Sequence, residues 1–123
     1  MKKLINIVAI KGSVRPGNYT GKALALAVHE MRKKEGVQVQ VFDPAKMALS
    51  FPGQDSDSGD AEQFQAAVSE ASGVLLATPE YHGGHSSVIK LMIENLGFPS
   101  TLSGKPVALL GVASGQIGAI KSL

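Results

Sequence analysis

The sequence contains no cysteine and no tryptophan, and it carries little excess charge of either sign. Without cysteine the chain has no disulfide framework, no thiol nucleophile and no cysteine metal site. The formal net charge of +2 is too small, and too evenly spread, to indicate nucleic acid as a partner. The longest apolar run falls far short of the ~20 residues that cross a bilayer, so we expect no membrane span.

The composition that remains is typical of one globular domain. Of the 123 residues, 44% are hydrophobic and 18% are charged, which excludes a disordered chain or a coiled coil. Two lysines precede an apolar run at residues 4–10, as in a secretory signal, but Asn6 interrupts the run and no small-residue cleavage site follows. We therefore expect a soluble, cytoplasmic protein with a single domain over residues 1–123.

Short apolar segments alternate with helical patterns along the chain. Apolar or alternating runs predict strands at residues 4–10, 37–42, 74–78 and 107–112. Apolar residues at helical spacing predict helices over about 20–34, 60–71 and 88–96. Asp60 with Gln63 resembles a capping box, with Asp60 as the N-cap of the second helix.

This order predicts an α/β fold, a doubly wound parallel sheet with right-handed crossovers. The strand at 37–42 alternates apolar and polar side chains, so it belongs at an edge. Ligands bind such sheets beyond the carboxyl ends of the strands, where the strand order reverses. In the flavodoxin-like order 2-1-3-4-5 that point lies between strands one and three. Three irregular loops reach this rim, at residues 12–20, 79–84 and 113–118.

Common nucleotide and metal motifs are absent. The loop after the first strand reads GSVRPG, which lacks the G-x-G-x-x-G of a Rossmann turn. Neither Lys22 nor Lys105 stands in a P-loop pattern. His82 and His85 have a ligand-like spacing, but zinc needs three or four protein ligands and no others are evident, so we expect no metal. No nucleophile–histidine–acid order or carboxylate pair is visible either, so a bound cofactor would have to carry any reaction.

The first loop has the groups that bind a phosphate. Ser13, Asn18 and Thr20 can donate hydrogen bonds, Arg15 offers a charged fork, and the loop opens into the N-terminus of a helix. With no lysine placed for further phosphates, a phosphomonoester fits better than a triphosphate. The alternative is that Thr20 only caps the helix and Arg15 is a solvated surface charge.

The second loop has the features of a site for a flat heterocycle. Pro79 stiffens its start, Tyr81 offers an amphipathic ring, and Gly83 and Gly84 let main-chain N–H groups approach a ligand. The alternative is an ordinary strand-to-helix turn, in which proline and glycine are expected anyway.

Taken together, the three loops resemble the pattern of a known protein family. GSVRPGNYT, TPEYHGGHSSVIKLMIENLG and GVASGQIGAIKSL, each directly after a predicted strand, resemble the NADPH-dependent FMN reductase family, which includes quinone, azo-dye and chromate reductases. The resemblance implies that Ser13, Arg15, Asn18 and Thr20 hold the FMN phosphate. It also implies that one segment lies along the isoalloxazine, and that two further residues close the other side of the ring. The segment is Pro79, Glu80, Tyr81, His82, Gly83 and Gly84, and the two further residues are Ser114 and Gly115.

Two positions depart from the family pattern. Asn18 stands where a hydroxyl is common, and His82 stands where asparagine is common. Both side chains can still donate hydrogen bonds.

The resemblance implies an FMN-dependent oxidoreductase that passes electrons from NADPH or NADH to a quinone or similar small acceptor. The flavin would carry the chemistry, so no catalytic acid or base is assigned. The family also suggests a homodimer or homotetramer, paired through the helix after the third strand. Two alternatives stay open: a flavodoxin-type electron carrier, although such carriers tend to be strongly acidic, and a truncated, flavin-free interaction domain.

A flavodoxin-like sheet has a fifth strand beside the fourth. Without it, residues 107–112 would form an edge strand that carries no charge, which proteins normally avoid. We therefore expect the domain to be incomplete at its C-terminal end, as part of a longer chain, or another chain to cover this edge.

Overall fold

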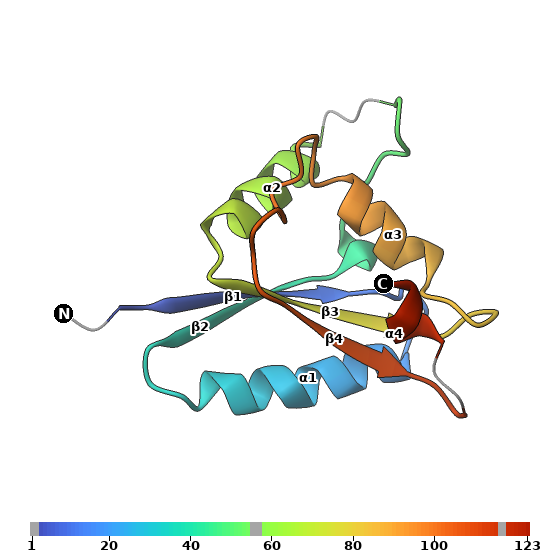
Figure 1. Cartoon of the computed structure of the whole chain (residues 1–123), viewed down its shortest axis with the longest axis horizontal. Helices are drawn as coiled ribbons and strands as arrows, with labels where there is room; N and C mark the ends of the chain where they lie inside the picture. The colour runs from blue at the N-terminus through green and yellow to red at the C-terminus, as the bar shows by residue number, and fades with distance from the viewer. Residues whose placement is uncertain (1–2, 55–57, 116–117) are drawn as a thin grey trace.

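The computed structural model describes residues 3–54, 58–115 and 118–123 and forms three layers (Figure 1). The strands are β1 (Ile5–Lys11), β2 (Val37–Phe42), β3 (Gly73–Pro79) and β4 (Val107–Val112). The helices are α1 (Tyr19–Arg32), η1 (Pro44–Lys46), α2 (Asp60–Glu70), α3 (Ser87–Glu94) and α4 (Ala119–Ser122). The predicted elements are therefore present, with bounds that shift by one or two residues.

The strands form one four-stranded parallel sheet in the order β2-β1-β3-β4. In Figure 1, α1 covers one face of the sheet, and α2 and α3 cover the other. This arrangement confirms the doubly wound fold, and its order matches the first four positions of the predicted 2-1-3-4-5. The reversal lies between β1 and β3, as expected for a flavodoxin-like sheet.

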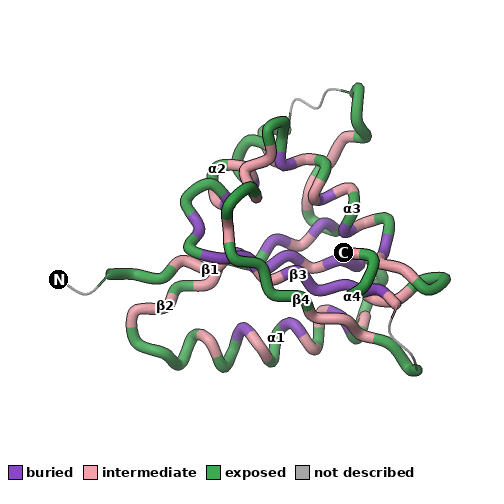
Figure 2. Tube along the Cα trace, in the orientation of Figure 1, coloured by how far each residue is buried: buried purple, intermediate pink, exposed green. Residues whose placement is uncertain are grey.

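The apolar strands place the core on both faces of the sheet. On one face, Phe64 of α2 and Ile89 of α3 pack against Ile10 and Leu76, all almost fully buried. On the other face, α1 covers a smaller cluster of Ala9, Leu24, Val28 and Ala77. Figure 2 shows the buried residues concentrated along β1 and β3, which explains why these two strands read as continuous apolar runs.

The two edge strands differ in character. β2 alternates half-buried and exposed residues over most of its length, as its sequence predicts. β4 occupies the other edge of the sheet, where Val107 and Leu109 remain 40% and 37% exposed. Within the described ranges, no helix has both the length and the apolar character needed to cross a membrane.

The predicted capping box at Asp60 is wrong. Gly59 is the N-cap of α2, in a left-handed conformation with φ 78°, and Asp60 is already the first helical residue. The Asp60 carboxylate instead accepts a hydrogen bond from the Ala48 N–H at 2.7 Å. A long-range contact that anchors the preceding loop has replaced the local cap.

Hydrogen bonds of the buried Ser86 link the carboxyl ends of β1 and β3 to the start of α3. The Ser86 hydroxyl donates to the Gly12 carbonyl at 2.6 Å and accepts from the Ile89 N–H at 3.0 Å. The Ser86 N–H donates to the Thr78 hydroxyl at 3.0 Å. Gly12 lies so close to β3 that a Cβ there would overlap the Ala77 carbonyl oxygen. One serine therefore caps α3 and also holds the loop that leaves β1.

We expect Ser86→Ala to lower the free energy of unfolding by about 1–3 kcal/mol, because it removes an N-cap and leaves the buried Gly12 carbonyl without its donor. Chemical denaturation measures this loss. Ser87→Ala is the matched control, since Ser87 is exposed at the first position of the same helix. Equal effects of the two substitutions would show that the buried bond contributes nothing.

Candidate functional site

The three loops predicted to carry function meet at the carboxyl end of the sheet. They enclose a cleft of about 560 Å³ between the start of α1 and the ends of β3 and β4. Its lining comprises Ser13, Arg15, Pro16, Gly17, Asn18, Tyr19, Thr20, Pro79, Glu80, Tyr81, Val112, Ala113 and Ser114.

Most of the predicted site residues line this cleft. His82, Gly83, Gly84 and Gly115 belong to the same loops but stand outside its lining. The sequence reasoning missed Tyr19, which is 75% exposed and lies on the α1 side. An aromatic side chain between two predicted phosphate-binding residues, at a position that no core pattern needs, was the available signal.

The first loop combines two buried hydroxyls with one exposed cation. Ser13 and Thr20 are 3% and 2% exposed, whereas Arg15 is exposed. The Ser13 hydroxyl accepts from the Arg15 N–H at 3.3 Å. Among the described residues, no carboxylate lies within ion-pair distance of Arg15. This loop can therefore offer hydroxyl donors and an unneutralised guanidinium to an anion.

Asn18, rather than Thr20, caps α1. Its side-chain oxygen accepts from the Gly21 N–H at 2.5 Å, and its side-chain nitrogen donates to the Arg15 carbonyl at 2.7 Å. The alternative in which Thr20 is the cap is thereby wrong. The Asn18 amide holds the loop in shape with both of its polar atoms.

The second loop is a tight two-residue turn. Tyr81 and Gly84 exchange two main-chain hydrogen bonds of 3.0 Å, and the residues between them, His82 and Gly83, have φ values of 53° and 77°. Both central residues are thus left-handed, as in a type I′ turn. Asparagine tolerates this conformation better than most residues, which gives a backbone reason for its place in the family pattern.

The third loop and α4 are tied to the second loop. The Gly118 N–H donates to the Glu80 carboxylate, and the Ser122 hydroxyl lies 2.7 Å from Nδ1 of His85. The His85 N–H also donates to the Ser122 hydroxyl at 2.9 Å. A side chain at Gly118 would overlap the Gly83 carbonyl, so only glycine fits at this crossing. These contacts hold the β3 and β4 sides of the cleft together.

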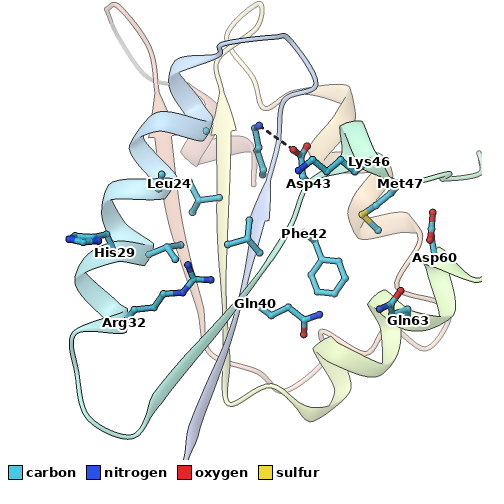
Figure 3. Close-up of a pocket in the computed structure, with 15 residues that line it drawn as sticks. Leu24, His29, Arg32, Gln40, Phe42, Asp43, Lys46, Met47, Asp60 and Gln63 are labelled. Carbon is cyan, nitrogen blue, oxygen red and sulfur yellow. Dashed lines mark hydrogen bonds and ion pairs between the residues drawn. The ribbon is translucent and has the colours of Figure 1, made fainter.

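A larger cavity of about 660 Å³ lies elsewhere, along the free edge of β2 (Figure 3). Several of its polar groups already have partners within the fold. The Lys11 ammonium is 3.5 Å from the Asp43 carboxylate, Asp60 holds the Ala48 N–H, and Arg32 donates to the Val39 carbonyl at 2.9 Å. The smaller cleft, which the three loops line at the reversal of the strand order, is therefore the candidate functional site. No group of three metal-ligating side chains occurs among the residues that the structure describes.

A family model for NADPH-dependent FMN reductases matches residues 5–123. The chain belongs to this family.

Relatives of this FMN reductase family member extend beyond its length. It is 29% identical to the NAD(P)H-dependent FMN reductase of Pseudomonas aeruginosa, over 96% of this chain and 65% of that protein. It is 30% identical to the FMN-dependent NADPH-azoreductase of Staphylococcus aureus, over 95% of this chain and 63% of that protein. The chain thus spans just under two thirds of these relatives.

Solved structures support the fold. The apo form of the NADH:FMN oxidoreductase EMOB superposes with a TM-score of 0.77 at 22% identity, over 90% of this chain and 59% of that one. FerB, a flavoenzyme NAD(P)H:acceptor oxidoreductase from Paracoccus denitrificans, superposes with a TM-score of 0.73 at 20% identity, over 91% and 63% of the two chains.

We expect His82→Val to lower the free energy of unfolding by about 1–2 kcal/mol, because a β-branched side chain strains a left-handed backbone. His82→Asn should retain the stability of this family member or raise it slightly. Thermal and chemical denaturation measure both. His29→Val is the control, at an exposed helical position with ordinary dihedral angles. If valine is tolerated equally at both positions, the turn does not constrain residue 82.

Proposed function

We propose that this chain binds FMN in the cleft and works in the cytoplasm as an FMN-dependent oxidoreductase. It would pass electrons from NADPH or NADH to a small acceptor such as a quinone or an azo compound. Membership of the FMN reductase family supports the cofactor and the reaction type. The position of the cleft, at the reversal of the strand order, supports the site.

The observation that carries the proposal is the donor set on the α1 side of the cleft. Two buried residues with hydroxyls, Ser13 and Thr20, line the cleft together with Arg15 at the start of a helix of 14 residues, and among the described residues the Arg15 guanidinium has no ion-pair partner. Buried hydroxyls together with one cation suit a phosphomonoester, the only charged end of FMN. Asn18 would contribute by holding this loop in shape.

The opposite side of the cleft suits a flat ring. Pro79 lines it from the end of β3, Glu80 and Tyr81 from the residues that follow, and Ser114 from the loop after β4. We propose that the isoalloxazine lies along this wall, with His82, Gly83 and Gly84 supporting it as the turn and Gly115 completing the far side. Since Tyr81 is 46% exposed, its ring is available for an aromatic contact.

This placement implies separate roles for FMN and for the residues of the chain. When bound, FMN would supply the ring that accepts a hydride and returns electrons. The residues of the chain would anchor the phosphate, orient the ring and leave one of its faces open to small molecules. We assign no side chain the role of catalytic acid or base.

We expect Arg15→Ala to weaken FMN binding roughly ten- to a hundredfold, because a charge-assisted contact to phosphate contributes about 1.5–3 kcal/mol. The free energy of unfolding should change by less than about 0.5 kcal/mol, since Arg15 is exposed. Titration of apo-protein with FMN, followed by absorbance, measures the affinity. Lys46→Ala, an exposed cation at the other cavity, is the control.

The same titration discriminates between the proposed function and its alternatives. Colourless protein that takes up no added FMN would favour a flavin-free interaction domain. Protein that binds FMN but does not oxidise NADPH or NADH with a quinone present would favour an electron carrier. Equal FMN affinity of Arg15→Ala and the unaltered protein would remove Arg15 from the site.

We also propose that the protein forms a homodimer or a homotetramer, paired through α3. Phe98, just beyond this helix, is fully exposed, and Phe51 is 67% exposed. Phe51 follows Ser50, whose carbonyl accepts from the Asn95 side chain at the C-cap of α3, so both rings flank the end of this helix. Exposed aromatic side chains of this kind are typical of protein interfaces.

We expect Phe98→Asp to convert the oligomer into monomers at micromolar concentration, because it places a charge in an apolar contact. Light scattering measures the mass. Leu26→Asp is the matched control, since Leu26 is 71% exposed on α1, on the opposite face of the sheet. A monomeric unaltered protein, or an oligomer that survives Phe98→Asp and dissociates with Leu26→Asp, would contradict this interface.

A further inference from the structure

The α1 side of the cleft carries an aromatic ring and a cation that the fold does not use. Tyr19 lines the cleft and leaves 75% of its surface exposed. The Lys22 ammonium lies 4.9 Å from the centre of the Tyr19 ring, within the range of a cation–π contact. Tyr19 and Tyr81 are the only two tyrosines of the chain, and both line this one cleft.

The α1 side of the cleft carries two cations. Arg15 already provides a cation beside the buried hydroxyls of Ser13 and Thr20. Lys22 is a second cation on the same side, and no carboxylate among the described residues lies within ion-pair distance of it. The Glu80 carboxylate, on the opposite wall, is engaged with the Gly118 N–H. An anion can therefore gain a contact with Lys22 without displacing an ion pair between described residues.

We propose that Tyr19 and Lys22 form a subsite for the adenosine 2′-phosphate of NADPH and thereby favour NADPH over NADH. This inference rests on the proposed function, because it concerns the reductant of that reaction. The Lys22 ammonium lies over one face of the Tyr19 ring, and the other face is the one on which an adenine can stack. NADH has the adenine but lacks the phosphate, so only NADPH engages both groups.

The phosphate of FMN is the competing source of negative charge for Lys22. The buried hydroxyls and Arg15 suit that phosphate better, because they lie inside the cleft and provide directed donors. Lys22 is exposed and reaches the cleft only through the Tyr19 ring. A group that arrives from solvent and binds at the rim fits this position.

The test uses two probes that differ by the 2′-phosphate alone. Adenosine 2′,5′-bisphosphate and adenosine 5′-monophosphate are titrated by calorimetry into the protein after it has been saturated with FMN. We expect the bisphosphate to bind roughly fivefold more tightly, the size of an exposed charge contact, with a preference that declines as salt increases. Lys22→Ala should bring the ratio of the two affinities to about one, and Tyr19→Leu should weaken both probes.

Lys34→Ala is the matched control, since Lys34 is an exposed cation beyond the far end of α1. It should leave the ratio unchanged, whereas an equal loss in both lysine variants would reduce the effect to overall charge and overturn the subsite. An unaltered ratio in Lys22→Ala would also overturn it. Weakened FMN binding in Lys22→Ala would instead assign Lys22 to the FMN phosphate.

The two proposals fail differently. Protein that never binds FMN overturns the proposed function; the two adenosine probes are then titrated into the apo-protein, where their ratio still tests Tyr19 and Lys22. Protein that binds FMN and oxidises NADPH and NADH with equal KM, and with equal ratios in all variants, retains the function and loses the subsite.

Discussion

The Ser86 hydroxyl is the contact on which the arrangement of the cleft depends. It joins the Gly12 carbonyl, at the end of β1, to the first turn of α3, and the Ser86 N–H reaches Thr78 at the end of β3. Both strands that flank the reversal of the sheet are therefore fixed to one buried point. Because these bonds are shielded from water, losing one would leave a buried polar group unsatisfied. The loops that leave β1 and β3 start from positions that cannot move independently.

Beyond Ser86, the walls of the cleft are held by hydrogen bonds that lie closer to the surface. The turn between Tyr81 and Gly84 closes on itself with two main-chain bonds, and α4 is attached to it through His85 and Glu80. On the other wall, Asn18 holds the loop before α1. A cleft held in this way loses little conformational freedom when a ligand binds, which favours affinity.

The sequence predicted the layers of the fold because these depend on local patterns. Apolar runs and helical spacing located the strands and helices, and the preference for right-handed crossovers ordered them. It could not predict that Asp60 would bind the Ala48 N–H, since the loop brings these residues together only in the folded chain. The left-handed backbone at His82 was equally hidden, because His-Gly is a weaker sequence signal for this turn than Asn-Gly or Asp-Gly.

The turn also changes how a ring can be recognised on the β3 side. The Gly84 N–H is donated to the Tyr81 carbonyl, and the Glu80 N–H to the Val112 carbonyl, so neither remains for a ligand. Under the proposed function, the Tyr81 side chain, Ser114 and the apolar surface of Pro79 would then be available to contact a flat ring. Such contacts favour a flat ring, and they depend less on the pattern of hydrogen-bond donors and acceptors on that ring. Under the proposed function, this wall would hold the flat isoalloxazine, and the directed, charged contacts on the opposite side would hold the phosphate end of the cofactor.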